Sequence, residues 1–145
     1  MTIRLFGLGR LAPPARRPGL LKGACRRALR SERADGPGEI SIVFLGRRGM
    51  RELNKRYLRH DYDTDVIAFR YPALSGAAGK DLPFGDIFVS AVQAGVQAKE
   101  LGRPLLAEIL TLILHGTLHL LGYEDSTPRK RARMFSRQEA LLRAL

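Results

Sequence analysis

The stretch LLAEILTLILHGTLHLL, residues 105–121, is the most apolar part of the chain and decides the fold that the sequence predicts. It is shorter than the about 20 apolar residues that cross a bilayer as a helix, and it contains a glutamate and two histidines. Gly102 and Pro104 precede it and Gly122 follows it, and residues of these types commonly flank a helix at its two ends. We therefore expect a long, buried central helix rather than a membrane span.

The segments on either side of this helix carry the patterns of strands and further helices. Residues 39–45, EISIVFL, alternate along the chain as a strand with one buried face does. Three more strands are expected from β-branched and aromatic residues, at 2–8, 65–71 and 85–92. Four more helices are expected, at 18–30, 46–59, 91–101 and 128–145. Because strands are scattered among helices, the predicted fold class is α+β: a single domain, 1–145, with a small mixed four-stranded sheet packed by about five helices.

The chain has a large excess of positive charge. Its 145 residues include 25 lysines and arginines against 14 acidic residues, which gives a formal net charge of +11. Such a charge attracts polyanions, with nucleic acid the first class of partner and an anionic membrane the second. A generally arginine-rich proteome would produce the same excess without any binding function.

Part of this charge recurs at helical spacing. One cationic stripe is predicted on the 46–59 helix, with the members Arg48, Arg51, Lys55 and Arg59. A second is predicted on the last helix, with the members Arg129, Lys130, Arg133 and Arg137. Either stripe alone is more typical of a solvated helix face than of a binding surface. Together with the net charge, the two stripes favour binding of a nucleic-acid backbone.

Cysteine usage and the N-terminus bear on the compartment. Cys25 is the single cysteine, which excludes an internal disulfide and a thiolate metal cluster. The first ten residues carry two arginines within a short apolar run, unlike a secretory signal. We expect a soluble protein of the reducing cytoplasm, without a membrane partner or a disulfide-linked partner.

Two histidines lie in the second half of the predicted central helix. His115 and His119 are four residues apart, so they lie about 40° apart around the helix axis and about 6 Å apart along it. Both rings can therefore bind one metal ion, and Glu108 and Thr111 extend the same polar stripe. Burial of an unpaired polar group costs about 1–3 kcal/mol, so each ring needs a partner. Core histidines bonded to backbone carbonyls are the alternative, and the spacing alone does not exclude them.

The residues after the second histidine favour the metal. Gly122 can reverse the chain at the end of the helix, and Asp125 can then approach from a third direction. The pattern H-x-x-x-H-x-x-G-x-x-D has the spacing of the metzincin zinc motif, H-E-x-x-H-x-x-G-x-x-H. Three protein ligands leave one position for water, as in catalytic zinc sites. We predict one Zn²⁺ ion per chain, held at the end of the central helix by His115, His119 and Asp125.

One residue of the zinc protease motif is missing. Those enzymes carry a glutamate, the general base, directly after the first histidine, and this chain has Gly116 there. A metalloprotease is therefore disfavoured.

The segment HGTLHLLGYED, 115–125, resembles the H-G-x-L-H-L-x-G-Y-D-H signature of the YbeY family of bacterial ribosomal RNA maturation factors and endoribonucleases. The block LNKRYLRHDYDTDVIAF, 53–69, is similar to the family's L-N-x-x-Y-R…T-D-V-L-S-F pattern, and GDIFVS, 85–90, fits as well. Glu108 and Glu139 also match. The resemblance implies zinc at the two histidines, with Asp125 where the family has its third histidine.

The resemblance also implies a function. It is that of a metal-dependent single-strand endoribonuclease in ribosomal RNA processing, in maturation of the 3′ end of the small-subunit RNA and in ribosome quality control. Ribosomal RNA or the small ribosomal subunit would be the partner, with Arg48, Arg51 and Lys55 as RNA-binding residues. The alternative is a non-catalytic ribosome assembly factor that binds RNA and holds a structural metal.

Four further residues have candidate roles, three of them from the resemblance and Glu124 from its place beside the predicted site. The family often has an arginine where this chain has Leu58, and Arg59 comes one residue later, about 100° around a helix. Arg59 and Glu124 are the candidate catalytic residues, although an exposed turn carboxylate is the favoured interpretation of Glu124. The resemblance places Thr64 and Asp65 near the metal, whereas a buried strand with a capped start is the alternative for both.

Overall fold

The computed structural model describes residues 1–58, 64–72 and 82–145, and it contains one four-stranded sheet. The strands are β1 (Thr2–Phe6), β2 (Glu39–Leu45), β3 (Val66–Arg70) and β4 (Pro83–Ser90), in the spatial order β1-β2-β4-β3. β1, β2 and β4 run parallel to one another, and β3 pairs antiparallel with β4 at the edge. The predicted mixed four-stranded sheet is confirmed.

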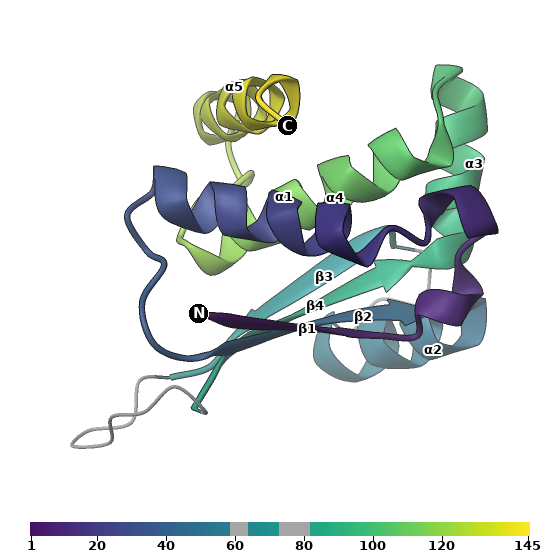
Figure 1. The fold of residues 1–145 in the computed structure, drawn as a ribbon, viewed down its shortest axis with the longest axis horizontal. Helices are drawn as coiled ribbons and strands as arrows, with labels where there is room; N and C mark the ends of the chain where they lie inside the picture. Colours follow the sequence, from purple (N-terminus) through teal and green to yellow (C-terminus); the bar gives the residue numbers. More distant parts are fainter. Residues whose placement is uncertain (59–63, 73–81) are drawn as a thin grey trace.

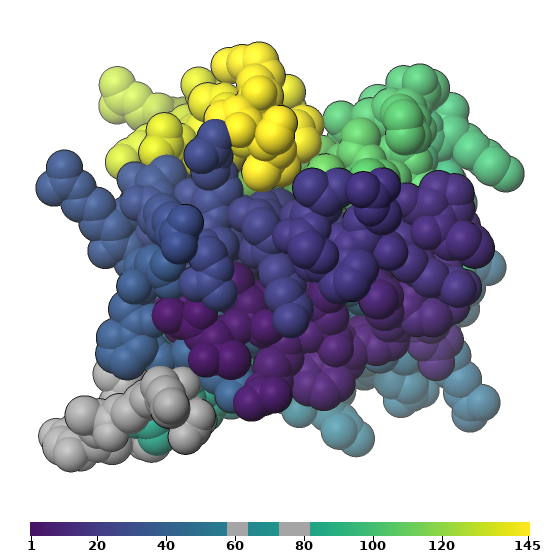
Figure 2. All heavy atoms as spheres, in the orientation of Figure 1, coloured from purple at the N-terminus to yellow at the C-terminus, as the bar shows by residue number. Residues whose placement is uncertain are grey.

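Five α-helices of the described residues pack around this sheet: α1 (Pro18–Ser31), α2 (Arg47–Leu53), α3 (Ala91–Leu101), α4 (Leu105–Leu120) and α5 (Pro128–Arg143). Figure 1 shows α1 and α4 on one face of the sheet and α2 on the other. α5 lies outside the layer of α1 and α4 (Figure 1), and the space-filling view shows it packed directly over α1 (Figure 2). The predicted α+β class with about five helices is confirmed.

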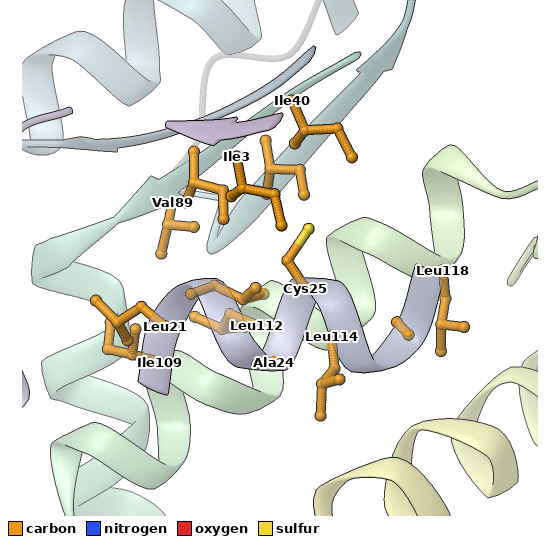
Figure 3. Packing of buried hydrophobic residues seen from close by; sticks show 14 of the residues in the cluster. Ile3, Leu21, Ala24, Cys25, Ile40, Val89, Ile109, Leu112, Leu114 and Leu118 are labelled. Carbon is orange, nitrogen blue, oxygen red and sulfur yellow. The ribbon is translucent and has the colours of Figure 1, made fainter. Parts of the chain in front are cut away.

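The core lies between the sheet and the layer of α1 and α4. Ile3, Ile40 and Val89 come from three different strands and point toward α1, where Cys25 points back at them (Figure 3). Burial raises the pKa of the Cys25 thiol to about 11, so this cysteine is an inert part of the packing. Each fully buried aliphatic side chain contributes about 1.5–3 kcal/mol to stability.

α4 is the predicted central helix, and it is buried on two opposite sides. Ile109 and Leu112 belong to the core near α1 and the sheet, whereas Leu114 and Leu118 point toward α5 (Figure 3). This explains why its sequence is apolar all round instead of on one stripe. Among the described residues, no single helix has the length and hydropathy of a membrane span, although α3 and α4 together pass that test across a bend of 117°.

Two predicted boundaries are wrong for local reasons. β1 ends at Phe6 instead of residue 8, because Gly7 adopts a left-handed φ of 76° that a strand cannot contain. The predicted 46–59 helix is α2 only as far as Leu53, and a π-helical turn follows over Asn54–Leu58. The wider turn buries Asn54 and leaves the Tyr57 side chain 55% exposed, although sequence periodicity places Tyr57 on the buried side.

α4 approaches the sheet closely at Gly116. A Cβ at this position would lie 2.7 Å from Cγ2 of Ile87 in β4 and 3.3 Å from Cγ2 of Val66 in β3. Distances of this kind leave no room for any side chain, because both neighbours are short, branched and held by the sheet. The glycine after His115 is therefore required by the packing of α4.

We expect Gly116→Ala to lower the free energy of unfolding by about 1–2 kcal/mol, because overpacking costs about 1–3 kcal/mol and better helix propensity returns about 1 kcal/mol. Gly95→Ala in α3 is the matched control, since a Cβ there meets nothing within 4 Å. It should raise stability by about 0.5–1 kcal/mol. Urea denaturation of the two variants tests this, and equal stability of both would contradict the close approach.

Candidate metal centre

The chain reverses sharply at the C-terminal end of α4. Gly122 has a φ of 99°, its N–H donates to the carbonyl of His119 at 3.1 Å, and the Tyr123 N–H donates to the carbonyl of Leu118 at 3.0 Å. These two bonds form the Schellman motif, in which a glycine in the left-handed region ends a helix. The predicted glycine turn is confirmed, and it brings Asp125 back alongside the last turn of the helix.

His115, His119 and Asp125 form a compact group of metal-ligating side chains. The two Nε2 atoms are 3.1 Å apart, and Oδ2 of Asp125 lies 3.4 Å from Nε2 of His119 and 3.7 Å from Nε2 of His115. One ligand atom from each residue lies within 4.8 Å of the others. The three residues that the sequence singled out are thus together, and they could hold a metal ion.

Hydrogen bonds on the far sides of the rings define which nitrogens face the group. Nδ1 of His119 donates to the backbone carbonyl of Tyr123 at 3.0 Å, and Nδ1 of His115 donates to Oε1 of Gln138 at 2.8 Å. In a neutral imidazole the other nitrogen, Nε2, then carries the lone pair. Both lone pairs therefore point to one place, with ring orientations fixed by second partners as in known metal sites.

The donor set fits a tetrahedral ion. Bonds of 2.0–2.2 Å from zinc to nitrogen or carboxylate oxygen place tetrahedral ligands about 3.3 Å apart, and the three distances in this group bracket that value. Without a cation, two lone pairs at 3.1 Å would repel. The convergence of two imidazole nitrogens and an anion on one point is the arrangement that a divalent cation stabilises.

The site is half-buried and opens to solvent on the side of the carboxylate. The side chains of His115 and His119 are 28% and 29% exposed, whereas that of Asp125 is 49% exposed. Burial lowers the pKa of His115 below its usual value and so favours the neutral ring that binds metal. Gln138 was missed by sequence analysis, although a lone glutamine between Met134 and Leu141 on the buried side of α5 is a detectable signal.

The rest of the polar stripe on α4 is satisfied by an arginine. Glu108 is 3% exposed, and its Oε2 accepts from Nε of Arg103 at 2.9 Å and from Nη2 at 2.5 Å. Nη2 also donates to Oγ1 of Thr111 at 3.2 Å. Glu108 and Thr111 therefore have partners of their own, and Arg103 beyond the N-terminus of α4 was not foreseen.

The resemblance placed Thr64 and Asp65 near the metal, and the structure separates their roles. Thr64 accepts a hydrogen bond from Nδ2 of the buried Asn54 at 2.5 Å, which ties the start of β3 to the turn after α2. Asp65 instead lines a cleft of about 340 Å³ together with His115 and Gln138. Only Asp65 of this pair lines the cleft beside the candidate metal centre.

Of the two candidate catalytic residues, the structure describes only Glu124. Glu124 forms an exposed ion pair with Lys130 at 2.6 Å, and this hydrogen bond lowers the pKa of Glu124. A carboxylate with a lowered pKa is a weaker base and a scarcer acid near neutral pH, so its catalytic role stays a prediction without support from the geometry. Arg59 lies outside the described residues.

The two predicted cationic stripes differ in their surroundings. Arg48, Arg51 and Lys55 are exposed and line one shallow groove along α2 and the π-helical turn after it, here called the α2 groove, on the opposite face of the sheet from α4 (Figure 1). On α5, three of the four predicted members have internal partners: Lys130 binds Glu124, Arg133 lies 5.5 Å from the ring centroid of Tyr123, and Arg137 donates to Glu32. The α2 groove gathers several cations on one exposed surface, which makes it a candidate for an anionic ligand.

We expect Asp125→Asn to weaken zinc binding by at least tenfold, because it removes the single anion among three ligands. Glu124→Gln removes the same charge from the adjacent residue, whose partner is Lys130, and should leave the affinity within about twofold. Isothermal titration with ZnCl₂ checks both. Equal affinities in the two variants would show that Asp125 is not a ligand.

Comparisons with known proteins show to which family the chain is similar. The family model described as Endoribonuclease YbeY matches residues 15–145. A protein of Elusimicrobium minutum named Endoribonuclease YbeY is 39% identical over 134 residues, which is 92% of each chain. One of Chlorobium phaeovibrioides with the same name is 36% identical over 145 residues, covering all of this chain and 91% of that protein.

A solved structure supports the fold. The solution structure of a Thermotoga maritima protein superposes with a TM-score of 0.63 over 97% of this chain and 87% of that one, at 22% sequence identity. At that identity the likeness concerns the fold alone. The match of the family model over most of the chain, and relatives above 30% identity over almost their whole length, show that this chain belongs to the YbeY endoribonuclease family.

Proposed function

We propose that this protein is a zinc-dependent single-strand endoribonuclease that processes ribosomal RNA, including the 3′ end of the small-subunit RNA, and that takes part in ribosome quality control. Its relatives are named endoribonucleases. The observation that carries the proposal is the convergence of two imidazole lone pairs and one carboxylate on a single point that solvent can reach. That arrangement suits hydrolytic chemistry on a phosphodiester better than it suits a purely structural site.

The number of ligands distinguishes the enzyme from a non-catalytic assembly factor. Structural zinc sites are closed by four protein ligands, whereas catalytic sites have three and one open position. Within the described ranges, the group has three members, and Asp125 on its exposed side leaves an approach for a substrate. When bound there, a divalent ion supplies a Lewis acid that polarises a phosphoryl oxygen and makes a water more acidic.

The chain's own residues supply orientation around that ion. Gln138 and the Tyr123 carbonyl hold the two imidazoles with Nε2 facing the ligand, so no ring has to rotate on binding. A protease is disfavoured further by the packing at Gly116, because the sheet fills the space that a glutamate side chain would need.

RNA reaches the site across a strongly cationic protein. The net charge of +11 and the α2 groove provide sequence-independent attraction for phosphates. Because α2 and α4 cover opposite faces of the sheet, a strand bound to both would pass around an edge of the sheet (Figure 1). We propose that Arg48, Arg51 and Lys55 bind a part of the RNA distant from the scissile bond.

Cleavage of a 5′-labelled single-stranded RNA from the small-subunit 3′ region tests the activity. Protein that is stripped of metal and reloaded with Zn²⁺ should cleave it, and the stripped protein should not. The His115→Ala/His119→Ala variant, purified in parallel, should neither bind zinc nor cleave. Persistent cleavage by the metal-free double variant would refute the proposed enzyme, and RNA binding without cleavage by the zinc-loaded protein would favour the assembly factor.

Replacing Arg48, Arg51 and Lys55 by glutamine should weaken RNA binding and reduce its salt dependence. Each phosphate contact contributes about 0.7 to the slope of log affinity against log salt for a single strand, so the slope should fall by about 2. The matched control replaces Arg17, Lys22 and Lys99, which are exposed outside the groove, by glutamine. Fluorescence anisotropy at several salt concentrations measures both, and equal slopes would exclude the groove as a specific contact.

A further inference from the structure

The packing at Gly116 brings a second strand next to the candidate metal centre. In the H-E-x-x-H pattern, the residue after the first histidine carries the carboxylate that serves as general base. Here that position faces Val66 of β3 at 3.3 Å and Ile87 of β4 at 2.7 Å, measured from an added Cβ. Asp65 directly precedes Val66 in the chain. The start of β3 therefore brings a carboxylate to the region beside Gly116, where α4 carries none.

The Asp65 carboxylate is held on both of its oxygens. Oδ1 accepts from the backbone N–H of Val66 at 2.7 Å, and Oδ2 accepts from Nε2 of Gln97 in α3 at 3.1 Å. The Asp65 backbone carbonyl also accepts from the N–H of Ser90 at 2.9 Å, which fixes the main chain at this point. Each carboxylate oxygen has a second lone pair, so an oriented carboxylate with one donor per oxygen can still accept a proton.

Asp65 faces the same cleft as the first histidine. Asp65, Gln97, His115 and Gln138 all line this opening of about 340 Å³. The nearby Glu108 is neutralised by Arg103, which leaves Asp65 and the exposed Glu100 as the acids of the cleft that have no ion-pair partner among the described residues.

We propose that Asp65 is the general base of the reaction, delivered by β3 in place of the glutamate that α4 has no room to carry. This inference rests on the proposed ribonuclease function. The attacking hydroxyl, of water or of the ribose 2′ carbon, gives its proton to a carboxylate oxygen of Asp65 as its oxygen bonds to phosphorus. The bond from phosphorus to the leaving ribose oxygen breaks, and that oxygen takes a proton from solvent. Gln97 is a positioning residue in this assignment, because its amide holds the Asp65 carboxylate.

Asp65→Asn is the primary test, with Glu100→Gln as the matched control. Asparagine keeps an oxygen acceptor for the Val66 N–H but accepts a proton poorly, so kcat on single-stranded RNA should fall about 10²–10⁴-fold. Zinc affinity and RNA affinity should stay within about twofold. Glu100→Gln removes an equal charge from the same cleft and should leave kcat within about twofold.

Asp65→Ala adds a readout that a structural role would not move. Formate can occupy the space left by the side chain and accept the proton, so added formate should restore part of kcat in this variant without changing the kcat of the wild-type protein.

A kcat of Asp65→Asn equal to that of the wild type, or equal losses of kcat in Asp65→Asn and Glu100→Gln, would overturn the assignment while leaving the ribonuclease proposal intact. Loss of zinc or a lower melting temperature in Asp65→Asn would also overturn it, since either makes Asp65 a ligand or a structural residue. A wild-type protein that never cleaves RNA would instead remove the function on which the inference rests.

Discussion

The contact between α4 and the sheet at Gly116 is the constraint on which the rest of the structure depends. A helix that is buried on both sides must lie close to the strands beneath it and to the helices above it, and only a residue without a side chain permits the distance observed here. This contact sets where His115 lies relative to β3. The two histidines of this apolar helix lie on its side between the sheet and α5. Polar partners are available there, since Gln138 and the Tyr123 carbonyl bond the two rings.

The turn after α4 has two roles at once. Its hydrogen bonds end the helix, and the Tyr123 carbonyl that it exposes orients the ring of His119. The same reversal returns Asp125 to the two rings, so a single local motif supplies one candidate ligand and positions another. The remaining orientation comes from α5 through Gln138, which means that residues far apart in the sequence fix the site. Pre-organisation of this kind lowers the cost of ordering side chains when an ion binds.

Local pattern was sufficient for much of the fold and for the three residues of the candidate metal centre. The alternation in 39–45, the glycine and proline boundaries of α4 and the spacing of His115, Gly122 and Asp125 all have short-range causes, so they could be predicted from the sequence. The π-helical turn could not, because it depends on the burial of Asn54 and its bond to Thr64, ten residues away. Gln138 was missed for the same reason, since its partner His115 lies 23 residues away on another helix. Arg103 was missed although its partner Glu108 is only five residues away, because the pair spans the break between α3 and α4. Periodicity also cannot tell that α2 and α4 lie on opposite faces of the sheet.

The attachment of α5 has a consequence for how the molecule responds to metal supply. This helix packs through Met134 and Leu141, and its polar contacts to the body include Gln138 with His115 and Arg137 with Glu32. A metal ion bound by His115 would hold its imidazole ring in place, and Gln138 of α5 is hydrogen-bonded to that ring. Part of the free energy of metal binding would therefore stabilise the packing of α5 on the body. Metal binding at the candidate centre and docking of α5 are therefore linked in both directions, so that a change that weakens one of them weakens the other.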